Sequence, residues 1–497
     1  MDNGLKDKYI HSQILASTPY QHRVLVMEEA LPLLPEKREI LRTTTWEAYK
    51  EALKKVSYIA IPMVVVTVSQ HLIRVLSMMM IGHLGELSLS GASVATSLTN
   101  VTGFSLVLGM ASGLETLCGQ AYGAEQYKKL GIYTTGAIIS LLMVCIPISI
   151  LWLFVDKILI FMHQDPLIST EAGKYSIWLL ISLFPFAILQ ALVRYLQTQS
   201  LILPMVLSSV ATLCFHVPIC WLLVFKLDFG SGGAAFAIGL SYWFNVLLLG
   251  FYVKYSSSCE KTRICFSSPE EFFASVREFF PLAIPSACMV CLEWWTFEIA
   301  ILLAGVLPKP QLETSVLSIC LSVATTHYFL PFSLGAGAST RVSNELGAGN
   351  HEAAKMAIRA ALTISMADAI ISSSVLYCCR HVVGYAFTNE KEVVDYLSDM
   401  TLFLCLLIVS DCIQAVLSGV ARGSGWQHLG AYVNLGSFYV VGIPVAIISA
   451  FLFHLQGKGL GIGLNVGNLL QSLLLSLITS STDWKKQASI ARERIFY

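Results

Sequence analysis

The chain has 497 residues, of which 55% are hydrophobic and 13% charged, and its formal net charge is zero. A soluble domain typically carries about 25% charged residues, so this composition excludes an ordinary soluble protein and indicates a polytopic membrane protein. Zero net charge provides no overall basic field, so we expect no nucleic-acid partner. The thirteen cysteines lie mostly in apolar runs. No pattern among them argues for a metal site, and we expect no cofactor.

The first half of the chain begins with polar and charged residues 1–56, which we interpret as a cytosolic N-terminal tail rather than a cleaved signal peptide. Apolar stretches long enough to cross a bilayer of about 30 Å follow. Strict alternation over about ten residues would indicate a barrel strand instead, and it is not seen. We therefore predict an N-lobe over residues 57–254 with six helical spans, at 57–81, 88–113, 131–155, 172–196, 205–225 and 230–253.

The second half begins with a charged linker, residues 255–280. Within it, SPEEFFASVREFF starts with Ser and Pro and continues with apolar residues at helical spacing, which predicts a short amphipathic helix on the inner face. Residues 484–497 form a basic, cytosolic C-terminal tail. Between them we predict a C-lobe over residues 281–483, with spans at 281–305, 314–338, 353–378, 396–421, 429–455 and 459–482.

The distribution of Lys and Arg gives the orientation. With the N-terminus inside, the inner connections hold eleven Lys or Arg, including Arg194 and Arg422, and the outer connections hold seven. The tails add nine before residue 56 and four after residue 484. Positive charge is typical of the cytosolic side, so both ends are predicted to be cytosolic.

The two halves resemble each other at offsets of 223 to 226 residues. Parallel repeats of six spans are related by an axis along the membrane normal, and their substrate sites lie between the halves near the midplane. Matching positions, in chain order, are Ile61-Pro62 with Ile284-Pro285, Gly123-Ala124 with Gly347-Ala348, Gln190-Ala191 with Gln414-Ala415, and Pro218 with Pro444.

The carboxylates inside the predicted spans lie in the second half of the chain. Those of the second half align with neutral residues of the first: Glu293 with Gln70, Glu298 with Val75, Asp368 with Val144 and Asp411 with Ala187. This asymmetry indicates that the C-lobe holds the ionisable chemistry.

Glu293 lies at the middle of its span, where an ionised acid costs about 2.5–3.5 kcal/mol on insertion scales. Burial favours the neutral form, so such a group can take up and release a proton near neutral pH. Asp411 is the natural second member, and two close acids titrate as a pair. Glu298 is about 7.5 Å further along the helix and about 140° round it, so it cannot share a face with Glu293. The alternative for each acid is a protonated group in a permanent hydrogen bond.

Two adjacent aromatic residues, Trp294 and Trp295, are candidates to line a cavity for cationic or planar substrates. Packing in the core or against lipid is the alternative for both.

Several motifs together resemble one family. They are GHLGELSLSGASVA, GLETLCGQAYGA, CLEWWTFE, STRVSNELGAGN, VLSGVARGSG and GAYVNLGSFYVVGIP, and the likeness runs from about residue 45 to 495. The chain resembles the multidrug and toxic compound extrusion (MATE) transporters, in particular their plant members. The resemblance implies twelve helices in two lobes, alternating access and exchange of organic compounds for protons. In the motifs, Glu293 matches the acid before the paired tryptophans, Glu298 the next glutamate and Asp411 the helix-10 acid.

The resemblance and the repeat together predict the function. We expect an all-α, two-lobed, proton-coupled antiporter that acts as a monomer in the plasma or vacuolar membrane. It would export xenobiotics or secondary metabolites, cationic or polar-aromatic in character, with Glu293 and Asp411 coupling protonation to substrate release. Glu298 is a third candidate for this coupling. Gln70, Asn434 and Tyr439 join the two tryptophans as candidates to line the cavity. Bacterial members of one subgroup carry an acid on the first helix, where this chain has Gln70 and no carboxylate.

Three other functions are alternatives to this prediction. A lipid or lipid-linked precursor flippase of a related fold would need a charged groove open to lipid and often extra spans. A membrane-embedded enzyme would carry a motif such as HExxH, GxSxG or DDxxD, and an ATP-driven pump would carry GxxxxGK[ST]; none of these is present. The chain is therefore predicted to be a secondary transporter and not an enzyme.

Overall fold

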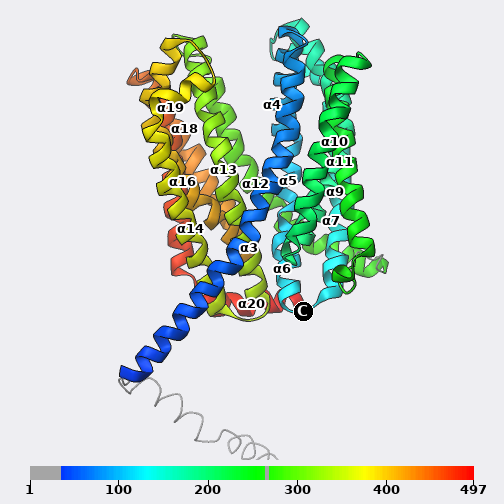
Figure 1. The fold of residues 1–497 in the computed structure, drawn as a ribbon, viewed down its shortest axis with the longest axis vertical. Helices are drawn as coiled ribbons and strands as arrows, with labels where there is room; N and C mark the ends of the chain where they lie inside the picture. The colour runs from blue at the N-terminus through cyan, green and yellow to red at the C-terminus, as the bar shows by residue number, and fades with distance from the viewer. Residues whose placement is uncertain (1–34, 264–267, 497) are drawn as a thin grey trace, which may run out of the picture. The chain divides into compact units, whose positions relative to one another are not determined.

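The computed structural model describes residues 35–263 and 268–496, which form helices and no strand. The chain divides into two compact units, residues 1–51 and 52–497. Of the first unit, the structure describes helical residues 35–51, part of α3 (Pro35–Gly82), where the rings of Trp46 and Tyr49 stack with 5.8 Å between their centroids. The fold described below is that of the second unit (Figure 1).

Twelve helices within the described residues are long and apolar enough to cross a membrane, as the sequence predicts. The first six spans make the N-lobe, and the first of them is the part of α3 that lies in the second unit. Its remaining elements are α4 (Glu86–Thr99), η1 (Asn100–Phe104), α5 (Ser105–Ala111), α6 (Gly113–Gly123), α7 (Tyr127–Trp152), α8 (Val155–Phe161), α9 (Pro166–Thr198), α10 (Ile202–Trp221), η2 (Leu222–Lys226) and α11 (Gly230–Tyr255).

The last six spans make the C-lobe. A 3-10 turn, η3 (Ser257–Cys259), precedes them. The C-lobe elements are α12 (Pro269–Ala304), α13 (Pro310–Gly347), α14 (His351–Cys378), α15 (Arg380–Val383), η4 (Gly384–Ala386), α16 (Lys391–Ser424), α17 (Gln427–Asn434), η5 (Leu435–Gly442), α18 (Ile443–Ile447), η6 (Ile448–Leu452) and α19 (Gln456–Ser481). A final short helix, α20 (Trp484–Phe496), follows.

The linker helix differs from the prediction of a separate element. Ser268 caps it as expected, since its hydroxyl accepts a hydrogen bond from the Glu271 amide at 3.3 Å, and Pro269 occupies the first turn. The helix then continues without a break to Ala304, so residues 269–280 are the first turns of α12. Phe279 is fully buried, and its burial ties these turns to the membrane-spanning part.

The two lobes meet through close backbone approaches at one end. A Cβ at Gly123 of α6 would lie in contact with the Asn344 carbonyl of α13, and a Cβ at Gly347 would meet the Gln120 carbonyl of α6. Glycine therefore permits an approach that any side chain would prevent. In Figure 1 the ribbons of the lobes converge at this end, where α20 also lies, and diverge toward the other. The predicted topology makes the converging end the cytosolic one.

Helix α20 is bonded to both lobes. Its Gln487 amide donates to the Ser424 carbonyl of α16 at 2.8 Å, and its Arg494 guanidinium donates to the Gln120 side chain of α6 at 2.8 Å. Trp484 packs on Trp426 with 5.3 Å between ring centroids. Residues 484–496 therefore form a helix that contacts both lobes at the end where they converge.

Candidate functional site

Glu293 lies on α12 with only 9% of its surface exposed, and three other C-lobe helices supply its hydrogen bonds. The Gln414 amide of α16 donates to Oε2 at 2.8 Å, and the Gln471 amide of α19 donates to the same atom at 3.3 Å. The Tyr328 hydroxyl of α13 donates to Oε1 at 3.2 Å. The carboxyl group is therefore buried and fully engaged by neutral donors, and no cation is directly bonded to it among the described residues.

A second layer of amides fixes these donors. The Gln471 amide also donates to Asn434 Oδ1 at 2.8 Å, and the Asn434 amide donates to the Met289 carbonyl at 2.7 Å, one turn before Glu293 on α12. The Gln414 amide also bonds the Ser418 hydroxyl at 3.0 Å. Asn434 is fully buried behind the site, so it positions Gln471 rather than lining a cavity.

Asp411, 6% exposed, lies on α16 one turn before Gln414. Its Oδ1 accepts a hydrogen bond from the Asn468 amide of α19. Asp411 and Glu293 interact electrostatically, but no hydrogen bond joins them within the described part of the chain. The two predicted acids are thus neighbours in one polar region, each with its own donors.

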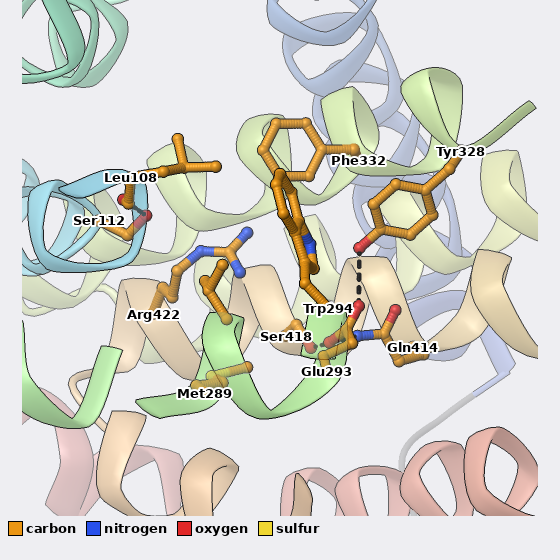
Figure 2. A pocket seen from close by; sticks show the side chains of 11 residues that line it. Leu108, Ser112, Met289, Glu293, Trp294, Tyr328, Phe332, Gln414, Ser418 and Arg422 are labelled. Atoms are coloured by element: carbon orange, nitrogen blue, oxygen red, sulfur yellow. Dashed lines mark hydrogen bonds between the residues drawn. The ribbon is translucent and has the colours of Figure 1, made fainter. Parts of the chain in front are cut away.

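A small pocket between the lobes opens beside Glu293, with about 20 Å³ of water-accessible space. Figure 2 shows its wall, with the carboxyl group of Glu293 below the ring of Tyr328 and the indole of Trp294 beside Phe332. Its lining residues come mostly from the C-lobe and are Leu108, Ser112, Met289, Val290, Glu293, Trp294, Tyr328, Phe332, Gln414, Ser418 and Arg422.

The other predicted lining residues lie elsewhere. Of the described residues that line this pocket, none is Gln70, Trp295, Asn434 or Tyr439. Trp295 turns toward the N-lobe, where its indole N–H donates to the Val101 carbonyl of η1 at 3.1 Å. Neighbouring residues on a helix point about 100° apart, so only one tryptophan of the pair can face the pocket.

Glu298 also faces the N-lobe. Its Oε2 accepts a hydrogen bond from the Ser97 hydroxyl of α4 at 2.7 Å. This contact joins the lobes on the side of α12 away from Glu293, in agreement with the expectation that the two glutamates do not share a face.

A buried charged cluster lies beside the pocket, on the side where the lobes converge, and Arg422 belongs to both. Glu115 of α6 is 1% exposed and pairs with Arg194 of α9 at 2.9 Å and with Arg422 of α16 at 3.0 Å. Both arginines count in the sequence as charges of inner connections. The structure places them inside the protein, at 3% and 7% exposure, where they and Glu115 tie the N-lobe to the C-lobe.

A second polar cluster includes Asp368. Ligand-type atoms of His327, Asp368 and Cys412 lie within 4.8 Å of one another on α13, α14 and α16. His327 Nε2 is 3.2 Å from an Asp368 oxygen, and that carboxylate also accepts from the Cys412 thiol at 3.4 Å and the Ser372 hydroxyl at 2.9 Å. These contacts account for the cluster, and we assign no metal to it.

Sequence reasoning missed the donors around Glu293, although one signal was present. Asn465, Asn468 and Gln471 recur at three-residue intervals within an otherwise apolar span, which places amides on one face of α19. Gln414 appeared only as a repeat match to Gln190. Tyr328 and Phe332 have no comparable signal.

The fold agrees with comparisons to known proteins. The MatE family model matches residues 62–222 and 285–448, one match for each half of the chain. The chain is 52% identical to Protein DETOXIFICATION 14 of Arabidopsis thaliana over 94% of its own length and 96% of that protein. It is 53% identical to Protein DETOXIFICATION 8 of the same plant, over 91% and 93% of the two chains.

Solved structures show the same fold. The crystal structure of the eukaryotic MATE transporter AtDTX14 is 53% identical in sequence and matches with a TM-score of 0.87, over 90% of this chain and 100% of that one. An outward-facing multidrug resistance MATE transporter, 17% identical, matches in fold with a TM-score of 0.78 over 89% and 97% of the two chains.

These findings define a secondary transporter of the plasma or vacuolar membrane, multi-pass and two-lobed, and not an enzyme. The chain belongs to the MatE family of multidrug and toxic compound transporters. The predicted family and fold class are confirmed, and the flippase alternative is not favoured.

Proposed function

We propose that the protein is a proton-coupled antiporter that exports organic compounds by alternating access, with Glu293 and Asp411 coupling protonation to substrate release. The observation that carries this proposal is the place of Glu293, a buried carboxyl group held by three donors in the wall of a pocket between the lobes. The pocket lies between two lobes of one chain, so we propose that the monomer is the transporting unit.

The site can accommodate both protonation states. An ionised carboxylate only accepts hydrogen bonds, whereas the protonated acid must also donate one. The amide oxygens of Gln414 and Gln471 are buried and have no partner among the described residues. A flip of either amide would turn its oxygen toward Glu293, where it can accept a hydrogen bond from the protonated carboxyl group. Protonation therefore rearranges the hydrogen bonds that connect α12 to α16 and α19.

Asp411 extends this effect along α16. It interacts electrostatically with Glu293, so the proton occupancy of one acid changes that of the other. Its partner Asn468 and the Glu293 partner Gln471 lie one turn apart on α19. A change of protonation at either acid therefore alters hydrogen bonds to α19, and Asp411 itself lies on α16.

The contacts through Gly123, Gly347 and the Glu115 cluster hold one end of the two lobes together, and in this proposal that end is the cytosolic one. From the outer or lumenal side, a proton neutralises the site and a cationic or polar-aromatic substrate leaves. After the lobes reopen inward, the proton dissociates and the charged site accepts the next substrate. One pH unit supplies about 1.36 kcal/mol per proton, and 100 mV about 2.3 kcal/mol per charge. Each is enough for roughly a tenfold concentration ratio or more.

The test is dye accumulation by purified protein in vesicles with an acidic lumen and no ATP. The wild type is expected to accumulate the cationic dye rhodamine 123 and to stop when the pH gradient is collapsed. The double variant Glu293→Gln, Asp411→Asn is expected to accumulate no more than empty vesicles.

The matched control is Glu298→Gln, on the same helix but outside the pocket, which is expected to retain gradient-driven accumulation. Normal accumulation by the double variant would show that neither acid couples transport to protons.

A further inference from the structure

Arg422 offers donors to the pocket that its structural contacts do not use. Its Nε bonds Glu115 at 3.0 Å, and its backbone carbonyl accepts from Gln427 at 3.3 Å and from the Thr116 hydroxyl. A guanidinium has five N–H donors, and Nε carries one of them. The remaining four lie on the two terminal nitrogens, for which no protein partner is found among the described residues. Figure 2 shows these nitrogens directed into the pocket, toward Trp294.

The charges around Arg422 do not balance. The single carboxylate of Glu115 is shared by Arg194 and Arg422, so this buried cluster carries one uncompensated positive charge. Uncompensated charge in a protein interior is costly unless a partner neutralises it. Glu293 interacts electrostatically with Arg422 from further along the same pocket, but it is not in salt-bridge contact with it. The proposed antiport cycle removes the Glu293 charge altogether once per turnover.

Between the two charged groups the pocket wall is aromatic. Trp294 and Phe332 lie between Arg422 and Tyr328 in Figure 2. A flat ring fits such a wall by stacking. A guanidinium fork binds carboxylates and similar oxyanions through two parallel hydrogen bonds. The pocket thus presents an anion donor at its inner end, an aromatic surface and a carboxyl group at its other end.

We propose that the terminal N–H groups of Arg422 bind the acidic group of those aromatic substrates that carry one. In such a compound a carboxylate or similar anion faces Arg422, the ring lies against Trp294 and Phe332, and a cationic or N–H group faces Glu293. This inference rests on the proposed function, because it requires Glu293 to be the site of substrate exchange. It adds a specificity-determining residue to that site.

The test compares two dyes that differ only in a methyl ester. Rhodamine 110 carries a free carboxylate beside its cationic ring system, and rhodamine 123 is its methyl ester. Arg422→Lys keeps a positive charge for Glu115 but removes the forked donors. We expect this variant to lower the affinity for rhodamine 110 by about tenfold or more, the size of one charge-assisted hydrogen bond, while affinity for rhodamine 123 stays within about twofold.

Arg194→Lys is the matched control, because Arg194 shares Glu115 but does not line the pocket. This variant is expected to change the affinities for both dyes by the same factor. Affinities are measured by fluorescence anisotropy on purified protein without a gradient, and uptake is measured in vesicles. A selective loss of affinity for rhodamine 110 in Arg422→Lys supports the proposal. An equal change in the affinities for both dyes, or no binding of rhodamine 110 by the wild type, overturns it.

The two proposals fail separately in this design. If wild-type uptake of rhodamine 123 ignores the pH gradient, the antiport function is wrong. The acid-to-ester affinity ratio of Arg422→Lys at equilibrium still decides the role of Arg422.

Discussion

The N-lobe and the C-lobe share one helix plan but are filled differently. One large cluster of buried apolar side chains, which includes Trp152, Tyr175 and Leu183, occupies the N-lobe. Several smaller apolar clusters lie among the described residues of the C-lobe, for example those around Leu317, Leu404 and Leu475. Between them lies the polar network around Glu293 and Asp411. The repeat thus provides the scaffold twice, but its buried ionisable groups are placed differently. Glu115 and Arg194 of the N-lobe lie where that lobe meets Arg422 of the C-lobe, whereas the hydrogen-bond donors to Glu293 all belong to the C-lobe.

The largest expected effect comes from moving the acid to the other lobe. In Glu293→Gln, gradient-driven uptake is expected to fall to the level of empty vesicles, since the exchangeable proton is lost. Adding Gln70→Glu, at the matching position of the N-lobe, is expected not to restore uptake, because Tyr328, Gln414 and Gln471 surround position 293 only. Uptake of rhodamine 123 into vesicles measures both variants. Restoration by Gln70→Glu would mean that the lobes are functionally interchangeable.

A smaller effect is expected from the matched amides Gln414 and Gln190. Gln414→Leu removes a donor to the ionised form of Glu293, so the proton stays bound to higher pH and the midpoint of the pH profile moves upward. A hydrogen bond to a charged group contributes about 1.5–3 kcal/mol, which corresponds to about one pH unit or more. Gln190→Leu is expected to leave the midpoint unchanged. An equal displacement in both variants, measured by uptake across a pH series, would remove the distinction between the lobes.

The smallest effect concerns stability, and here the lobes are expected to behave alike. Gly123→Ala and Gly347→Ala each place a Cβ against a backbone carbonyl of the other lobe, which cannot yield as a flexible side chain would. Each is expected to lower the free energy of unfolding by about 1–3 kcal/mol, the usual cost of overpacking.

Gly250→Ala and Gly436→Ala are the matched controls for these glycines, one in each lobe, because a Cβ there meets nothing within 4 Å. Thermal unfolding in detergent compares the four variants. A Gly123→Ala protein as stable as Gly250→Ala would contradict the close approach of the lobes.

Much of the architecture follows from local sequence. The length of each apolar stretch predicts a span, and the repeat of these stretches at offsets of 223 to 226 residues predicts two lobes. The burial of Glu293 followed from its central place in a span, and its separation from Glu298 followed from helix geometry. The segment at 269–280 was predicted as a separate amphipathic helix from its Ser-Pro start and the helical spacing of its apolar residues. The structure continues the helix through both Pro281 and Pro285.

The composition of the pocket could not be predicted in the same way. Whether Trp294 or Trp295 faces it depends on the rotation of α12 against the N-lobe. Its other walls combine α13 and α16, which are separate spans in the sequence. Arg422 is the clearest case: in the sequence it is one more positive charge of an inner connection. Its burial and its partner Glu115, 307 residues away, depend on how the lobes meet.

Helix α20 has a practical consequence for anyone who labels this transporter. It is bonded to α16 through Gln487 and to α6 through Arg494, so one of these contacts must break before the lobes can separate at this end. A fluorescent reporter fused after α20 would report on that separation. We expect deletion of residues 484–497 to favour the form in which the lobes are apart at this end.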